Sequence, residues 1–190
     1  MIATGTVWLV RHAPTDWTGT RWCGRADPPL QRDGLLVAID VGARIAAEAP
    51  PGTAIWTSPL RRARQTAAAI GAALAAEPVV DDDLVEVDVG RVEGLTWGEL
   101  SIREPATAAA ILGGGSVDWP GGETAAAVGA RAATVAARIR AVVDDGAGLV
   151  VVSHGAFLAD LARALLEPTE PVPVALEAGG IFRVPGRLAA

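Results

Sequence analysis

Two short apolar runs in the chain have the composition of buried β-strands, and a histidine follows each of them. Residues 7–10 lead into Arg11 and His12, and residues 149–152 lead, through one serine, to His154. Such uninterrupted, valine-rich runs are typical of strands covered on both faces. In an open α/β sheet, ligands bind beyond the carboxyl ends of the strands. We therefore expect these two histidines, the only ones in the chain, to face one pocket, although a lone histidine in such a place is often structural.

The rest of the chain alternates between helical and strand-like patterns. Helical spacing is found over residues 30–49, 60–76, 121–143 and 156–166, and short strand-like runs occupy residues 54–57, 78–80 and 179–184. Ser58 and Pro59 have the residue types of an N-cap and a first helical position, so we expect them to begin the second helix. This alternation predicts a three-layer α/β/α sandwich, with a mainly parallel central sheet and helices on both faces.

The domain organisation that the sequence predicts is simple. We expect one domain over residues 1–190, because no repeat or linker interrupts the pattern. Residues 97–120 are the least regular part and contain Gly113-Gly114-Gly115. We interpret this segment as a small insertion, or a flexible lid, that covers the active site.

Composition narrows the possible partners and location. The net charge of −6 argues against nucleic acid, and no apolar stretch is long enough to span a membrane. A single cysteine, Cys23, agrees with a reducing cytoplasm. The chain contains no lysine, which excludes a Walker-type phosphate loop. We expect a cytoplasmic protein, for which a homodimer is one assembly that the sequence permits.

Several kinds of chemistry do not fit these residues. Ser153-His154-Gly155 lacks the glycine-flanked serine of a nucleophile elbow, and two histidines without a cysteine pair disfavour a structural zinc site. The acidic run of residues 81–83 is more typical of a solvated turn than of a cation site. Phosphoryl transfer fits, because arginines bind phosphate in a bidentate manner, a neutral imidazole is a competent nucleophile, and a carboxyl group can serve as acid and base.

The pair Arg11-His12 after a buried strand resembles the signature of the histidine phosphatase superfamily, which includes phosphoglycerate mutase-like enzymes. Further segments resemble its motifs in the expected order, and they are residues 24–30, 58–67, 84–94, 122–124 and 153–155. The resemblance covers nearly the whole chain and favours the phosphatase branch, similar to α-ribazole phosphatase and broad-specificity phosphatases. Ala13 departs from the pattern, because the first motif usually has glycine there.

The resemblance implies a role for each matched residue. His12 would attack phosphorus, and Arg11, Arg62 and His154 would bind the phosphoryl oxygens. Arg62 is selected by the L-x-R-A spacing; otherwise it would be a solvated helix residue, as we expect for Arg61 and Arg64. Glu86 would be the general acid and then the base, with Glu93 as the alternative for that role.

Four further residues are candidates for substrate binding. Thr18 stands where the family often has an asparagine that contacts phosphate, and its hydroxyl can also donate a hydrogen bond. Trp22, like Trp17, would either shape the leaving-group pocket or serve packing alone. Arg25, with Arg21, would recognise a second anionic group. Glu123 would belong to the site or would only begin a helix.

Three functions remain open from the sequence. The favoured one is a metal-independent phosphomonoesterase that hydrolyses a small phosphorylated metabolite through a phosphohistidine on His12. The alternatives are a phosphoglycerate mutase and a non-catalytic phosphate-binding module. The expected partner is a small-molecule phosphate ester, and neither a metal ion nor a cofactor is expected. The sequence does not identify the metabolite.

Overall fold

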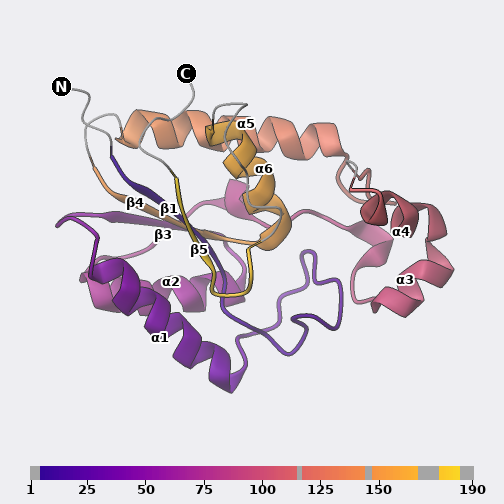
Figure 1. Cartoon of the computed structure of the whole chain (residues 1–190), viewed down its shortest axis with the longest axis horizontal. Helices are drawn as coiled ribbons and strands as arrows, with labels where there is room; N and C mark the ends of the chain where they lie inside the picture. The colour runs from indigo at the N-terminus through magenta and orange to yellow at the C-terminus, as the bar shows by residue number, and fades with distance from the viewer. Residues whose placement is uncertain (1–4, 115–116, 144–146, 167–175, 185–190) are drawn as a thin grey trace.

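The fold is built on a five-stranded sheet (Figure 1). A computed structural model describes residues 5–114, 117–143, 147–166 and 176–184. The sheet has the strand order β3-β2-β4-β1-β5, and its strands are β1 (Val7–Arg11), β2 (Ala54–Thr57), β3 (Val79–Val80), β4 (Leu149–Ser153) and β5 (Ile181–Val184). Strands β1 to β4 are parallel, and β5 pairs antiparallel with β1. The prediction of a mainly parallel sheet is confirmed.

Helices cover both faces of the sheet, as Figure 1 shows. Side chains that alternate along β1 and β4 enter two separate cores. Leu9 and Val151 pack with α5 (Ala125–Val143) and α6 (Gly155–Leu165), whereas Trp8 and Val150 pack with α1 (Arg32–Ala46) and α2 (Arg61–Leu74). Both faces of these strands are buried, which explains why their sequences are apolar without alternation. The three-layer α/β/α prediction is therefore confirmed.

Helix α2 begins later than its sequence suggested. Its N-cap is Leu60, whose side chain cannot accept a hydrogen bond, so the prediction that Ser58 caps this helix is wrong. Instead, the carboxylate of Asp27 accepts a hydrogen bond from the Arg61 N–H group at 2.6 Å. A side chain from a distant loop therefore satisfies a free donor at this helix start. Ser58 is left free for another contact.

Residues 97–120 are more regular than predicted. They form α3 (Trp97–Arg103) and α4 (Pro105–Leu112), and α3 starts with a capping box between Thr96 and Glu99. The expectation of an irregular segment at 97–112 is therefore wrong, because a single strong cap and Pro105 were enough to start two short helices. Both helices lie beside the sheet rather than on either face (Figure 1). Gly115 lies outside the described residues.

The acidic turn and the long helix also differ in detail from their predicted forms. Asp81 caps the 3₁₀ helix η1 (Asp82–Leu84) by accepting from the Asp83 N–H group. Arg138 pairs with Asp81 at 2.9 Å and with Asp83 at 3.0 Å. Helix α5 begins at Ala125, later than the predicted residue 121. None of the helices in the described part of the chain combines the length and apolar character needed to cross a membrane.

Candidate active site

The two histidines lie together at the carboxyl ends of neighbouring strands. His12 follows β1 and His154 follows β4. The backbone N–H group of His12 donates to the backbone carbonyl oxygen of Ser153 at 2.9 Å. Their ring centroids are 5.1 Å apart, with the rings tilted by 57°. The predicted meeting of the two imidazoles is confirmed. His12 lines a cavity of about 580 Å³, whereas His154 lies behind it at 0% exposure.

The imidazole of His12 is held as a neutral base. Its Nδ1 atom lies 2.8 Å from the Ala13 carbonyl oxygen, an acceptor only, so Nδ1 carries the proton. The Arg62 Nε–H group donates to Nε2 at 3.2 Å, so Nε2 presents a lone pair. Burial, together with the charges of Arg62 and Arg11, lowers the pKa of His12 from 6.5 to about 3. At neutral pH this nitrogen is an available nucleophile.

His154 is oriented by Ser58. The Ser58 Oγ atom lies 2.7 Å from His154 Nε2 and also accepts a hydrogen bond from the Leu60 N–H group at 3.2 Å. Among the described residues His154 Nε2 is the one acceptor within reach of the Ser58 hydroxyl proton, so we assign that proton to the bond with Nε2 and the imidazole proton to Nδ1. That Nδ1 atom is buried and has no hydrogen-bond partner among the described residues. Burial first, and the charge of Arg62 second, lower the pKa of His154 well below its usual value.

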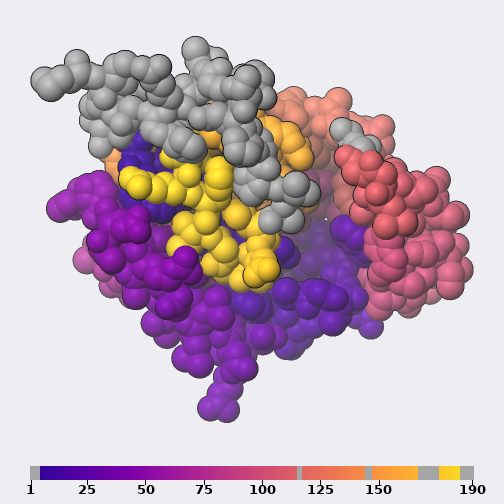
Figure 2. Space-filling model, viewed as in Figure 1, coloured from indigo at the N-terminus to yellow at the C-terminus, as the bar shows by residue number. Residues whose placement is uncertain are grey.

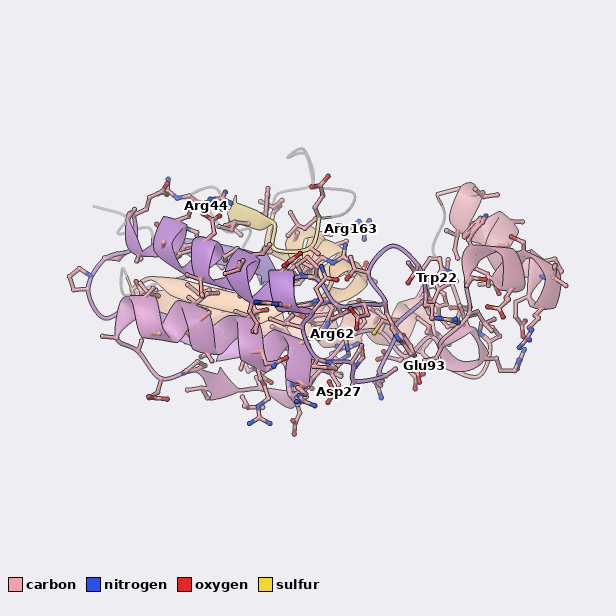
Figure 3. The ribbon with its side chains drawn as sticks, turned by 90° about the horizontal axis from the view of Figure 1, so that it is seen from below. Trp22, Asp27, Arg44, Arg62, Glu93 and Arg163 are labelled. Carbon is pink, nitrogen blue, oxygen red and sulfur yellow. The ribbon has the colours of Figure 1, made fainter. Side chains whose placement is uncertain are left out.

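Arg62 is fully buried, at 0% exposure. Besides its bond to His12, it donates to the carbonyl oxygens of Ala26 at 2.6 Å and Gly24 at 2.9 Å. The alternative that Arg62 is a solvated helix residue is therefore wrong, whereas Arg61 and Arg64 are exposed, as expected. The loop that contains Asp27 thus fixes the guanidinium against the nucleophile; Figure 3 shows Arg62 among the side chains at this end of the sheet.

Arg11 is the last residue of β1, and its guanidinium lies against Gly155 at the start of α6. It donates to the Leu176 carbonyl oxygen at 2.7 Å, and its buried Nε has no partner among the described residues. A Cβ atom on Gly155 would lie 3.2–3.3 Å from three guanidinium atoms of Arg11, so only glycine leaves this arginine undisturbed. Since buried donors are almost always satisfied, and Arg11 lines the cavity, its Nε is suited to bind an oxygen of an anion there.

Of the two candidate acids, Glu86 lines the cavity. Its Oε1 atom accepts hydrogen bonds from the Val87 N–H group at 2.9 Å and from the Phe157 N–H group at 3.0 Å. Its Oε2 atom has only a long contact, 3.4 Å, with the Ala156 N–H group, so this oxygen is the freer one. Glu93 does not line the cavity, and its carboxylate accepts from the Ala26 N–H group at 2.8 Å.

The four predicted substrate-binding residues divide into two pairs. Thr18 and Trp22 line the cavity. Arg25 and Glu123 do not, and they form an ion pair with each other at 3.4 Å. Arg131 approaches Glu123 at 2.9 Å, and the Asp88 N–H group donates to the same oxygen at 2.8 Å. Glu123 is thus shared by two arginines, and Arg25 also lies 3.8 Å from the Asp88 carboxylate. A substrate-binding role for Arg25 and Glu123 stays a prediction.

Sequence reasoning missed several residues of the site. Ser58 directly follows β2, so its place at a third strand end could have indicated its contact with His154. Trp97 and Trp119 also line the cavity, but no local pattern marked them. Cys23 lines it as well, and burial raises the pKa of its thiol, which disfavours a thiolate nucleophile. No three His, Cys, Asp or Glu side chains gather to hold a metal ion within the described ranges.

A neutral imidazole beside two guanidinium groups, at the strand ends of an α/β sandwich, is chemically suited to bind a phosphoryl group. Comparison with protein families makes this assignment specific. The model of the histidine phosphatase superfamily, branch 1, matches residues 7–175. The chain belongs to this superfamily.

Known relatives include phosphatases. The chain is 39% identical over 163 residues to a bifunctional protein of Mycobacterium tuberculosis, a match that covers 84% of this chain but 43% of that protein. It is 32% identical over 154 residues to the metal-independent phosphoserine phosphatase of Arabidopsis thaliana, which covers 79% of this chain and 64% of the relative. The chain thus spans less than two thirds of the length of either protein.

The fold also matches solved structures. Mycobacterial glucosyl-3-phosphoglycerate phosphatase superimposes with a TM-score of 0.78 at 26% sequence identity, covering 94% of this chain and 89% of that one. This likeness agrees with the central sheet and with the helices on its two faces. Phosphatases therefore occur both among the sequence relatives and among the solved structures that are similar to this chain.

Proposed function

We propose that the protein is a metal-independent phosphomonoesterase that hydrolyses a small phosphorylated metabolite through a phosphohistidine on His12. The observation that carries this proposal is the state of His12, whose Nε2 lone pair is available while the bond from Nδ1 to the Ala13 carbonyl holds the ring in place. Membership of the superfamily and the phosphatases among the relatives support it further.

In the first half of the reaction, His12 Nε2 attacks phosphorus in line with the ester oxygen. The N–P bond forms as the P–O bond to the alcohol breaks, and the departing oxygen takes the proton of the Glu86 carboxyl group. The bond from Arg62 Nε to His12 Nε2 is given up, which frees that donor for a phosphoryl oxygen. Arg11 Nε and His154 Nδ1 supply further donors to the same group.

In the second half, water attacks the phosphohistidine. The Glu86 carboxylate takes one proton of the water, the N–P bond breaks, and inorganic phosphate leaves with the water oxygen. His12 is then neutral again and Glu86 is protonated again, so every atom and charge is accounted for. Throughout, the Ala13 carbonyl oxygen accepts from Nδ1 and stabilises the positive charge of the phosphorylated ring.

The arginines make a metal ion unnecessary in this scheme. Two guanidinium groups and the N–H group of His154 provide the positive charge and the hydrogen-bond donors that a phosphoryl group needs in its transition state. The metal-independent relative in Arabidopsis thaliana supports this part of the proposal.

The first test measures phosphate release in the presence of EDTA. Wild-type protein should hydrolyse a phosphomonoester, and His12→Ala should not. Glu86→Gln should lower kcat on an alkyl ester by about 10²–10⁴-fold. With an aryl ester whose leaving group departs without a proton, the variant should accumulate an acid-labile, alkali-stable phosphoprotein. Glu93→Gln is the matched control, because its carboxylate only accepts a backbone N–H outside the cavity lining.

The other outcomes identify the alternatives. Turnover that requires a metal ion would refute metal independence. Label that moves between the hydroxyls of phosphoglycerate without release of phosphate would identify a mutase. A protein that binds phosphate esters while His12→Ala changes no turnover would be a binding module.

A further inference from the structure

The cavity beyond His12 has an aromatic wall. Four of the six tryptophans of the chain line it, and they are Trp17, Trp22, Trp97 and Trp119. The ring of Trp22 lies 6.3 Å from that of Trp97 and 5.6 Å from that of Trp119. Figure 3 shows Trp22 between Arg62 and the helices α3 and α4. The aromatic wall and the reacting groups therefore line one cavity.

These indoles are not all filling a core. Trp97 is 42% exposed, and the other three are half-buried. Val89 and Ile111 add apolar surface between them. Figure 2 shows the surface hollowed between the pink α3–α4 region and the body of the molecule. Since the same cavity contains His12 and Glu86, the alcohol part of a bound ester would lie against this wall.

Few cationic side chains line the cavity beside the aromatic wall. Apart from Arg11 and Arg62 at the nucleophile, Arg21 is the one cation among the described residues that line the cavity. Arg21 donates to the Gly94 carbonyl oxygen at 2.7 Å and lies 3.9 Å from the Glu99 carboxylate, which offsets its charge. Arg25 is paired with Glu123 outside the lining. A second phosphate or carboxylate would find no unpaired cation here.

We propose that the alcohol part of the substrate carries a flat aromatic group and no second anionic group. This inference rests on the proposed phosphomonoesterase function. It differs from the acidic substrates in the names of two phosphatases similar to this chain, a phosphoserine phosphatase and a glucosyl-3-phosphoglycerate phosphatase. An aromatic ring gains both burial and stacking against indoles, whereas a carboxylate loses its hydration without gaining a partner.

The test compares esters of primary alcohols. 2-Phenylethyl phosphate, propyl phosphate and phosphoserine differ in the group that meets the wall, while the phosphoryl group stays the same. We expect kcat/KM for 2-phenylethyl phosphate to exceed that for propyl phosphate by at least about tenfold, mainly through KM. Phosphoserine should be the poorest of the three. Equal values, or a preference for phosphoserine, would overturn the inference.

Two variants on one helix separate the wall from general effects on α3. Trp97→Ala should reduce the ratio of kcat/KM between 2-phenylethyl and propyl phosphate several-fold. Ile102→Ala is the control, because Ile102 lies on the same helix, is 82% exposed and does not line the cavity. It should leave the ratio unchanged. A ratio that Trp97→Ala does not alter would refute the role of the wall.

Binding of phosphonates tests the wall without turnover. 2-Phenylethylphosphonate should quench tryptophan fluorescence at a concentration at least about tenfold lower than propylphosphonate. If no ester is hydrolysed but this preference is found, the phosphomonoesterase function fails while the binding preference stands. If esters are hydrolysed without any aromatic preference, the function stands and the inference falls.

Discussion

The proton positions on the two imidazoles provide the most direct test of the site. The contacts place the proton of both His12 and His154 on Nδ1, because the Ala13 carbonyl accepts from one ring and the Ser58 hydroxyl donates to Nε2 of the other. Replacing Ser58 with alanine removes the donor to His154 and nothing else from that ring. We expect the proton of His154 to redistribute between its two nitrogens in Ser58→Ala.

The magnitude follows from the burial of this contact. Ser58 and His154 are both 0% exposed, so Nε2 would lose its 2.7 Å partner with no access to solvent. Leaving one buried polar atom unsatisfied costs about 1–3 kcal/mol of folding free energy. For a chain of this size, each kcal/mol lowers Tm by about 2–4 °C. Loss of a donor to the transition state lowers kcat by at most about 10²–10³-fold.

Nitrogen-15 NMR of the imidazoles measures the proton positions directly. The chain has only two histidines, so a long-range nitrogen–proton correlation spectrum contains two sets of ring signals. Wild-type protein should show the Nδ1–H form for both rings at neutral pH. In Ser58→Ala the nitrogen shifts of His154 should move toward an average of the two forms, while those of His12 stay in place.

Thr53→Ala is the matched control for this experiment. Thr53 is buried just before the opposite end of β2 and donates to the Pro50 carbonyl oxygen at 2.7 Å. Its loss should lower Tm by a similar amount without changing the His154 shifts or kcat. A wild-type His154 with its proton on Nε2 would refute the reasoning, as would unchanged nitrogen shifts in Ser58→Ala.

Two further predictions concern Arg11 and acid stability. In Gly155→Ala the new Cβ atom would lie 3.2–3.3 Å from the Arg11 guanidinium. Moving that side chain off its preferred rotamer costs about 0.5–1.5 kcal/mol. Steady-state kinetics should therefore show kcat/KM lowered roughly two- to tenfold. Gly98→Ala on α3 meets open space and should leave it unchanged. Because burial lowers both imidazole pKa values, only the unfolded chain takes up these protons below pH 6.5. The free energy of unfolding in urea should therefore fall by up to about 1.4 kcal/mol per pH unit for His12 as the pH falls from about 6.5 to about 3. His154 should add a loss of the same sign below pH 6.5. A pH slope that His12→Gln does not reduce would contradict this.

The parts of the fold that the sequence predicted are those governed by buried strands. The runs before His12 and His154 had to be covered on both faces, so their parallel pairing and the meeting of the two histidines followed from local pattern alone. Arg62 was selected by its resemblance to a family motif. Its complete burial depends on carbonyl groups from a distant loop, which no helical pattern reveals.

The parts that the sequence did not predict depend on contacts between distant segments. The first N–H group of α2 donates to Asp27, about thirty residues earlier in the chain, and Ser58 contacts His154 as well as the Leu60 N–H group. Arg25 had the composition of a cation free to bind substrate, but it pairs with Glu123 and lies 3.8 Å from Asp88. Such pairings depend on tertiary structure, so neither spacing nor composition could have distinguished them.

The helices α3 and α4 have a small hydrophobic cluster of their own. Leu100 and Ala108 pack there with Val89 and Val92, and Trp119 packs against both this cluster and the core that α5 and α6 cover. Changes within residues 97–112 can therefore accumulate without weakening the sheet on which the reacting groups stand. The leaving-group pocket can therefore change while the fold stays intact. In a library randomised at the cavity-facing positions of this segment, most variants should fold and keep the reacting groups. Variants that accept other leaving groups could then be selected from it.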